Sequence, residues 1–281
     1  SDQWHSALFG VIEKETSKWT TSLGIRWDHG LSTPVRSDLT SDIGVIEPKT
    51  HQALSGALTV TVPMGDRVIV SLTGGRTARL PTLNELFSEG PHLASYTYEV
   101  GNPAASVETA WVGDLDARLE FSSFTFTAST YGSMYDTYLV SKNTGERSTR
   151  FANLFVYQVS DQPARIVGFD LESEWQFSRQ WSAFSQASWV RGEFESTEGS
   201  WENLPLMAPF KTQHTLQWRK GPWSASSTLL YKGAQNNTGP FETPTEGFVR
   251  LDARAEYRWF PSDSERLWIF SLRGKNITNT T

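Results

Sequence analysis

The chain has 281 residues and a formal net charge of −6; hydrophobic residues make up 38% of it and charged residues 20%. This composition excludes a disordered chain, and the acidic balance excludes a basic surface for nucleic acid as a partner. The absence of cysteine excludes disulfides, thiolate metal sites and cysteine nucleophiles, and no apolar run approaches the roughly 18 residues of a transmembrane helix.

Alternation of apolar and polar residues begins near the N-terminus and continues along the chain. Trp19, Ile25 and Trp27 share one face of a predicted strand, whereas Arg26 and Asp28 share the other. The pattern predicts an all-β fold of about twelve strands. These cover residues 4–15, 18–29, 51–62, 66–78, 107–121, 123–135, 153–177, 181–194, 210–220, 222–234, 247–260 and 265–276.

The predicted connections alternate in length. They are short after the odd-numbered strands, as in VPMGDR at 62–67 and RKGPW at 219–223, and long after the even-numbered ones. In an antiparallel meander this places the short turns at one end of the sheet and the long loops at the other, as in outer-membrane barrels. The sequence therefore predicts one domain, residues 1–281, folded as an antiparallel transmembrane β-barrel meander.

Aromatic residues gather near both ends of the predicted strands, where a membrane barrel carries rings at headgroup depth. Those near the short turns are Trp19, Phe121, Phe124, Trp175, Phe177, Trp181, Trp218, Trp223, Trp259 and Trp268. Those nearer the long loops are Trp27, Trp111, Tyr135, Trp189, Tyr231 and Phe248. The alternative is the core of a soluble β-sandwich or propeller, but that fold would leave the charged strand faces without a covering layer.

The face opposite the apolar one is rich in ionisable side chains. Between Val249 and Trp259, five alternate positions carry Arg, Asp or Glu, which a soluble core would not tolerate. In a barrel this face lines the lumen, where charges act on the passage of polar solutes. We expect six residues to be lumen-lining, with mutual salt bridging as the structural alternative for each: Arg26, Arg118, Asp170, Glu172, Arg254 and Arg258.

One predicted loop, RLPTLNELFSEGPHLASYTYEVGNP at 79–103, is too long for a hairpin turn. Pro81 ends the strand before it, because proline removes a ladder donor. Leu83, Leu86 and Phe87 are expected to form one helical turn capped by Thr82.

Five segments resemble those of a known family. They are GGRTARLPTLNELFSEGPHLASYTYEVGNP at 74–103, VYQVSDQPARIVGFDLESEW at 156–175, WVRGEF at 189–194 with LPLMAPFK at 204–211, ETPTEGFVRLDARAEYRW at 242–259, and LRGKNITN at 272–279. In this order they resemble the C-terminal part of the barrel of TonB-dependent outer-membrane receptors. The loop containing His92 is most similar to the zinc and haem receptors of that family.

The resemblance implies a barrel of about 22 strands, of which twelve would be present. It also implies a plug domain and a last strand, which we do not find in these residues, so we expect either part of a longer receptor or a reduced, closed barrel. The implied function is TonB-dependent uptake of a siderophore, haem or metal ion across the Gram-negative outer membrane. The implied partners are the lipid bilayer, the inner-membrane TonB complex and the small-molecule or metal ligand, and no resident cofactor is expected.

The long segment at 79–103 supplies the candidate ligand contacts. We expect His92, Glu89, Glu99, Tyr96 and Tyr98 to bind ligand, with His92 as the candidate metal ligand. No second histidine stands at ligand spacing, so solvated loop side chains are the alternative.

A second loop offers another group of candidate metal ligands. His29 and His51 bound a segment that contains three acidic residues, Asp38, Asp42 and Glu47. Together these side chains could converge on a divalent cation.

Enzyme activity is not expected. No local Ser/His/Asp signature is present, and the GDR and GGR segments lack the lysine and spacing of a phosphate loop. The one enzymatic alternative is a hydrolase site formed by convergent side chains without a sequence motif. Two other functions also stay open: a passive pore formed by a closed twelve-strand barrel, natural or engineered, and a soluble sandwich or propeller that binds a ligand.

Overall fold

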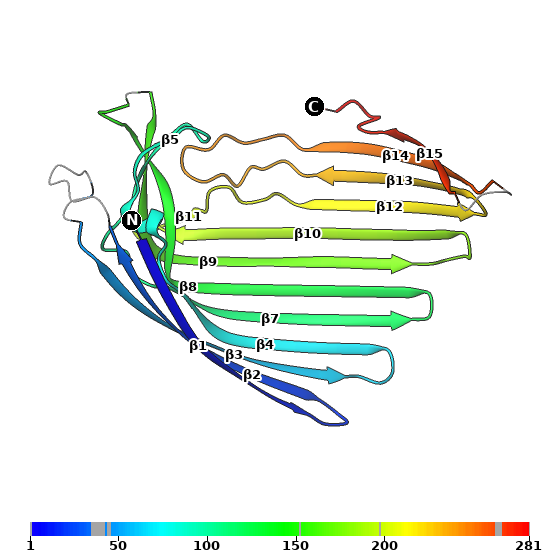
Figure 1. Cartoon of the computed structure of the whole chain (residues 1–281), viewed down its shortest axis with the longest axis horizontal. Helices are drawn as coiled ribbons and strands as arrows, with labels where there is room; N and C mark the ends of the chain where they lie inside the picture. Colours follow the sequence, from blue (N-terminus) through cyan, green and yellow to red (C-terminus); the bar gives the residue numbers. More distant parts are fainter. Residues whose placement is uncertain are drawn as a thin grey trace.

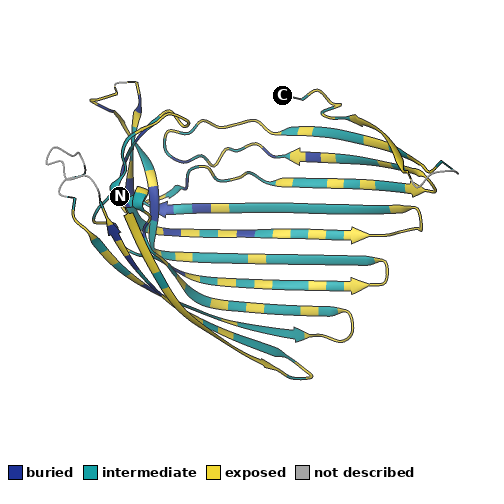
Figure 2. Cartoon of the chain, viewed as in Figure 1, coloured by how far each residue is buried: buried dark blue, intermediate teal, exposed yellow. Residues whose placement is uncertain are grey.

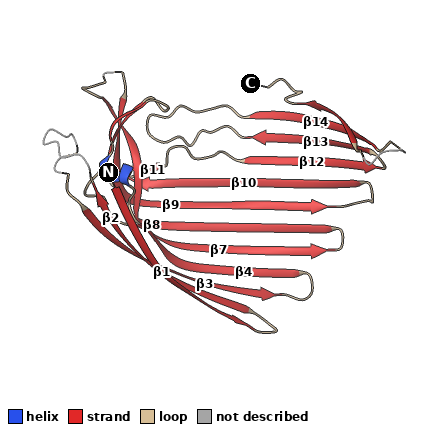
Figure 3. Ribbon diagram, viewed as in Figure 1, coloured by secondary structure: helices blue, strands red, loops and turns tan. Residues whose placement is uncertain are grey.

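The computed structural model of the chain describes residues 2–34, 43, 46–151, 153–196, 198–261 and 266–280. Its strands form one sheet in which spatial neighbours follow the order along the chain (Figure 1, Figure 3). The twelve long strands are β1 (Asp2–Glu15), β2 (Thr20–Thr33), β3 (Lys49–Pro63), β4 (Val68–Arg79), β7 (Glu108–Phe121), β8 (Phe124–Arg147), β9 (Phe155–Trp175), β10 (Trp181–Glu195), β12 (Lys211–Lys220), β13 (Trp223–Lys232), β14 (Phe248–Trp259) and β15 (Trp268–Gly274). The predicted antiparallel meander is confirmed.

The sheet is open. In the described residues β1 pairs only with β2 and β15 only with β14, while the ten strands between them have a neighbour on each side. Figure 1 shows the tight turns at one end of the strands and the long loops at the other. The described strands therefore form part of a barrel wall rather than the reduced, closed barrel, and no second sheet packs on them as a sandwich would require.

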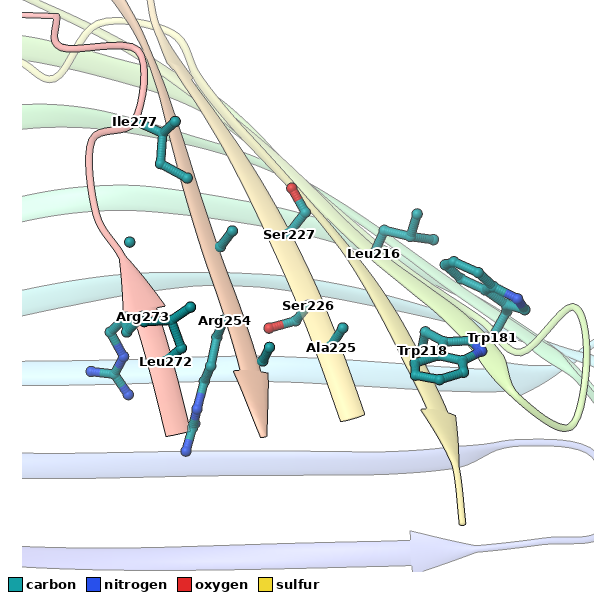
Figure 4. A pocket seen from close by; sticks show the side chains of 13 residues that line it. Trp181, Leu216, Trp218, Ala225, Ser226, Ser227, Arg254, Leu272, Arg273 and Ile277 are labelled. Atoms are coloured by element: carbon teal, nitrogen blue, oxygen red, sulfur yellow. The ribbon is translucent and has the colours of Figure 1, made fainter. Parts of the chain in front are cut away.

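Strand register gives the sheet two chemically different faces. One face, which we call the outer face, carries Ile25, Trp111 and Leu115. These side chains are 53%, 59% and 47% exposed, although all are large and apolar. Figure 2 shows the exposed positions spread along the strands rather than confined to their ends. In Figure 4, Arg254 points to one side of the sheet and Trp218 to the other. We call the side of Arg254 the inner face.

The outer face carries aromatic side chains at two heights. Ten residue steps separate Trp111 from Phe121 on β7. At about 3.3 Å per residue and a strand tilt of about 40°, this separation is about 25 Å along the barrel axis, the height of a membrane barrel's apolar band. The expectation is wrong for Tyr135 and Phe248, which pair with inner-face residues. Both were assigned to the aromatic group because they lie near a long loop. Each is one residue away from an outer-face position, so its side chain lies on the inner face.

Four short elements lie in the long loops: α1 (Leu83–Phe87), β5 (Glu89–His92), β6 (Thr97–Val100) and β11 (Trp201–Asn203). Strand β8 also runs twelve residues beyond the predicted 123–135. The prediction ended too early because a register shift between Tyr135 and Tyr138 interrupts the alternation of apolar and polar residues. The described residues contain no helix with the length and apolar character needed to cross a bilayer.

The buried core lies where the long loops fold against the sheet. Leu86 and Phe194 are both fully buried, in contrast to the exposed apolar residues of the outer face. Three clusters of buried residues hold this end together: Val140, Ala164, Phe194 and Leu204; Leu86, Ala105 and Leu139; and Tyr98, Val100 and Leu154. The loop end of the sheet is therefore a packed structure.

Candidate functional site at the loop end of the inner face

Helix α1 begins where the sequence predicts it. The Thr82 hydroxyl accepts a hydrogen bond from the Glu85 backbone N–H at 3.2 Å, and the Thr82 N–H donates to the Glu85 carboxylate at 2.8 Å. This reciprocal capping box satisfies two donors at the helix start. A Cβ at Gly101 would lie 2.7 Å from the Leu86 carbonyl carbon, so only glycine lets the returning chain pass this close to the helix.

Arg79, the last residue of β4, connects the helix to the sheet. Its guanidinium donates to the Glu85 carboxylate at 2.8 and 2.9 Å and to the Glu108 carboxylate at 2.9 and 3.1 Å. Glu108 also accepts the Leu139 backbone N–H at 3.0 Å. Planar, charge-assisted bonds of this kind fix orientation as well as position. One arginine thereby ties β4, α1 and β7 together at the loop end.

Glu85 gives this connection a pH dependence. Burial raises the pKa of Glu85, but hydrogen bonds from Arg79 and Thr82 outweigh it, so the pKa lies below the usual glutamate range. A lowered folded-state pKa stabilises the connection above the unfolded value, about 4.3. That stabilisation is lost as the pH falls through the folded-state pKa.

We expect Arg79→Gln to loosen α1. The Glu85 and Glu108 carboxylates would lose their shared cation, but because Arg79 is half exposed the cost is about 1 kcal/mol. Hydrogen exchange at the amides of residues 83–88 should therefore become about fivefold faster at pH 7. Arg179→Gln, in the turn between β9 and β10, is the control and should leave that exchange unchanged. Equal exchange in Arg79→Gln and the unsubstituted protein would contradict this role, and the difference should shrink as the pH falls below the usual glutamate range and Glu85 becomes protonated.

The predicted ligand residues lie on a β5–β6 hairpin that continues from α1. His92 and Glu99 face each other, with Nδ1 and Oε1 3.0 Å apart, and both side chains are exposed. Tyr96 is 77% exposed at the hairpin tip. These three residues are accessible to a ligand.

The other two predicted ligand residues are placed differently. Tyr98 is buried against Leu154, because β6 pairs in parallel with β9. The Glu89 side chain is also buried and forms an ion pair with Arg150 at 3.0 Å. Both side chains hold the hairpin, and their proposed ligand contact would require it to open.

The two histidines proposed to bound a metal-binding loop do not come together as ligands. His51 Nε2 lies 3.3 Å from the Ala105 carbonyl oxygen, and His29 stacks on Trp27. Asp38 and Asp42 lie outside the described residues. In the part of the chain that the structure describes, no group of three or more His, Cys, Asp or Glu side chains could hold a metal ion.

A polar cavity that sequence reasoning missed lies on the inner face beside Arg79. Asp28 accepts hydrogen bonds from Arg26 at 2.7 and 2.8 Å and lies 2.8 Å from His5 Nε2. The cavity has a volume of about 250 Å³, and Gln3, Arg79 and Thr82 also line it. It therefore presents a guanidinium, an imidazole and a carboxylate to anything that enters the loop end.

The six predicted lumen-lining residues share the inner face by strand register: Arg26, Arg118, Asp170, Glu172, Arg254 and Arg258. Three of them have acidic partners two positions away on the same strand: Arg26 with Asp28, Arg118 with Glu120 at 3.3 Å, and Arg254 with Glu256 at 3.0 Å. The structure thus shows the salt bridging that was the alternative. A role in solute passage stays a prediction.

A two-faced antiparallel meander, with tight turns at one end and packed loops at the other, defines the wall of an outer-membrane-type β-barrel. A family model described as TonB dependent receptor-like, beta-barrel, matches residues 1–279. The chain belongs to this family, whose members are transport receptors of the Gram-negative outer membrane rather than enzymes.

Solved structures share this fold at low sequence identity. The copper transporter OprC has 17% identity and a TM-score of 0.82, with 98% of this chain and 42% of that chain covered. The ferric citrate transporter FecA in its unliganded form has 16% identity and a TM-score of 0.74, with 99% and 40% covered. The ferric yersiniabactin uptake receptor FyuA from Yersinia pestis has 14% identity and a TM-score of 0.69, with 99% and 41% covered. The chain thus spans about two fifths of each. No curated protein matches it in sequence.

Proposed function

We propose that the chain supplies twelve strands of an outer-membrane receptor barrel that takes up a metal-containing nutrient: a siderophore, haem or a metal ion. The observation that carries this proposal is the polar cavity on the inner face, which opens beside a packed and charged loop end. A ligand arriving from outside meets His92, Glu99 and Tyr96 first, and the Arg26–Asp28–His5 cavity after them.

The chemistry of these groups suits an anionic metal chelate better than a bare ion. Arg26 bonds Asp28 through Nε and Nη2, and its Nη1 side can donate to carboxylate, catecholate or phosphate oxygens of a ligand. The metal of such a chelate keeps its own ligands, so the protein needs no cluster of three metal-binding side chains. His92 and Glu99 add one imidazole and one carboxylate at the entrance.

The structural similarity of this chain to known transporters supports the same proposal. The proteins of similar structure include a copper transporter, a siderophore receptor and a ferric citrate transporter. We propose that the barrel lies in the outer membrane and that uptake through it needs the inner-membrane TonB complex. The apolar outer face then contacts lipid.

The test is uptake of radiolabelled ferric siderophores, haem and copper by cells whose only receptor is the full-length protein. We expect uptake of one of these that stops when the TonB complex is deleted. Arg26→Gln should weaken binding of that nutrient about tenfold, the loss of one charge-assisted contact. Arg219→Gln, near the short turn between β12 and β13, is the control and should leave affinity unchanged.

Two results would overturn the proposal. One is the absence of TonB-dependent uptake for every nutrient class. The other is steady open-channel current across a planar bilayer from the purified protein, which would make it a passive pore. Unchanged affinity in His92→Ala would show that this histidine does not contact the ligand, and would leave the rest of the proposal unaffected.

A further inference from the structure

One row of the outer face, near the long loops, carries three charged side chains. Strand register aligns Arg76 on β4, Trp111 on β7, Met134 on β8, Arg165 on β9 and Glu193 on β10. Trp111 and Met134 are 59% and 65% exposed, so the row lies on the surface. Arginine on this face is costly in a lipid core and tolerated only at the interface.

The height of the row places it at such an interface. Trp111 lies about 25 Å above Phe121, so the row lies at the opposite edge of the apolar band. The long loops begin just beyond it. The guanidinium groups therefore lie at the depth of lipid headgroups, in the leaflet on the loop side.

Together with Arg191, which lies one row below beside Val167 on β9, this row has more positive than negative charge. Glu193 accepts hydrogen bonds from Arg165 and Arg191, both at 2.7 Å, so one carboxylate is shared by two guanidinium groups. Arg76 donates to the Leu54 carbonyl oxygen at 3.5 Å, a contact that does not neutralise its charge. The four side chains leave two positive charges. Arg76 and Arg165 lie three strand spacings apart, about 14 Å, a span that a broad phosphorylated headgroup can bridge.

Below this row, toward the middle of the apolar band, the surface is flat. Gly74, Gly113 and Gly132 lie in register on β4, β7 and β8. A Cβ would meet nothing within 4 Å at Gly74, and only single atoms at 3.9 to 4.0 Å at the other two. Packing within the described chain therefore does not demand glycine there. Glycine within a strand often marks a place where another molecule lies close to the backbone.

We propose that Arg76 and Arg165, with Arg191 and the three glycines in the row below them, bind a phosphorylated lipid of the leaflet on the loop side. The arginines hold its phosphate groups and the acyl chains lie over the glycines. The proposal rests on the membrane location in the proposed function but not on the nutrient. A failure of uptake therefore leaves it standing.

The test is binding to the purified full-length receptor in detergent, measured by native mass spectrometry. The probes are the bisphosphorylated glycolipid lipid A, its dephosphorylated form, and inorganic phosphate. We expect lipid A alone to bind, and Arg76→Gln or Arg191→Gln to weaken it about fivefold each, since a basic residue at a lipid surface contributes about 1 kcal/mol. Arg118→Gln, on the inner face of β7, is the control.

Glu193→Gln separates lipid binding from a structural role. Removing this carboxylate raises the net positive charge, so lipid A should bind more tightly, whereas a purely structural role predicts weaker binding or none. Equal binding of the dephosphorylated lipid would overturn the proposal. So would competition by inorganic phosphate at equal concentration, which would make the patch a site for free phosphate. Unchanged affinity in both arginine variants would overturn it as well.

Discussion

Leu115→Arg is expected to destabilise the barrel by about 2–4 kcal/mol, the cost of a cation at the middle of an apolar band. Leu115 lies on the outer face of β7, six residues from Phe121 and four from Trp111, and is 47% exposed. In water, an exposed leucine would accept arginine at almost no cost. The expected loss therefore depends on lipid at this face.

The free energy of unfolding in lipid vesicles, followed by tryptophan fluorescence in urea, checks this. Asp114→Arg is the matched control, since Asp114 is the adjacent residue and lies on the inner face. We expect it to change the free energy by less than about 1 kcal/mol. Equal losses in the two variants would contradict the assignment of the faces, and no loss in either would contradict the membrane location.

The sequence predicted the strands well because period-two alternation is a local signal. Each long strand carries its own apolar face, so its alternation can be recognised without knowing which strands lie beside it. The prediction was wrong where that signal breaks. Strand β8 continues past Tyr135 through a register shift, and a prediction based on alternation alone ends the strand at that residue.

The candidate site was less predictable, because it depends on which strands and loops meet. His5 and Asp28 are 23 residues apart, and only the β1–β2 register brings them to 2.8 Å. Tyr98 looked like a ligand contact in an exposed loop, yet parallel pairing of β6 with β9 buries it. A sequence shows which side chains carry charge, but the partner of each is set by tertiary structure.

The two faces and the loop end have different sources of stability. The outer face has apolar side chains exposed to its surroundings, and the inner face is held by ion pairs along its strands. Among the described residues, the clusters of buried apolar side chains lie at the loop end, where they form a core of the kind that soluble proteins have. A cavity there should therefore cost as much as it would in a soluble core.

Phe194→Ala is the test of that core, and we expect it to destabilise the loop end by about 3–5 kcal/mol. Phe194 is fully buried on β10 among Val140, Ala164 and Leu204, and Lys142 Nζ lies 4.5 Å from the centre of its ring. Alanine would leave a cavity lined by residues of three other segments. Val140 and Ala164 cannot move in without giving up their strand pairing, and Leu204 is held by the hydrogen bond from its N–H to the Gly192 carbonyl oxygen at 2.9 Å.

Hydrogen exchange at the amides of residues 138–142 and 201–204 measures this effect where it arises. We expect those amides to lose most of their protection in Phe194→Ala. Amides of β12 to β14 should keep theirs, because the cavity lies among β8, β9 and β10 at the loop end. Phe9→Ala is the control: Phe9 is 70% exposed on β1, so its removal should cost less than about 0.5 kcal/mol. A loss of protection spread evenly over all strands would show instead that the loop end and the sheet unfold as one unit.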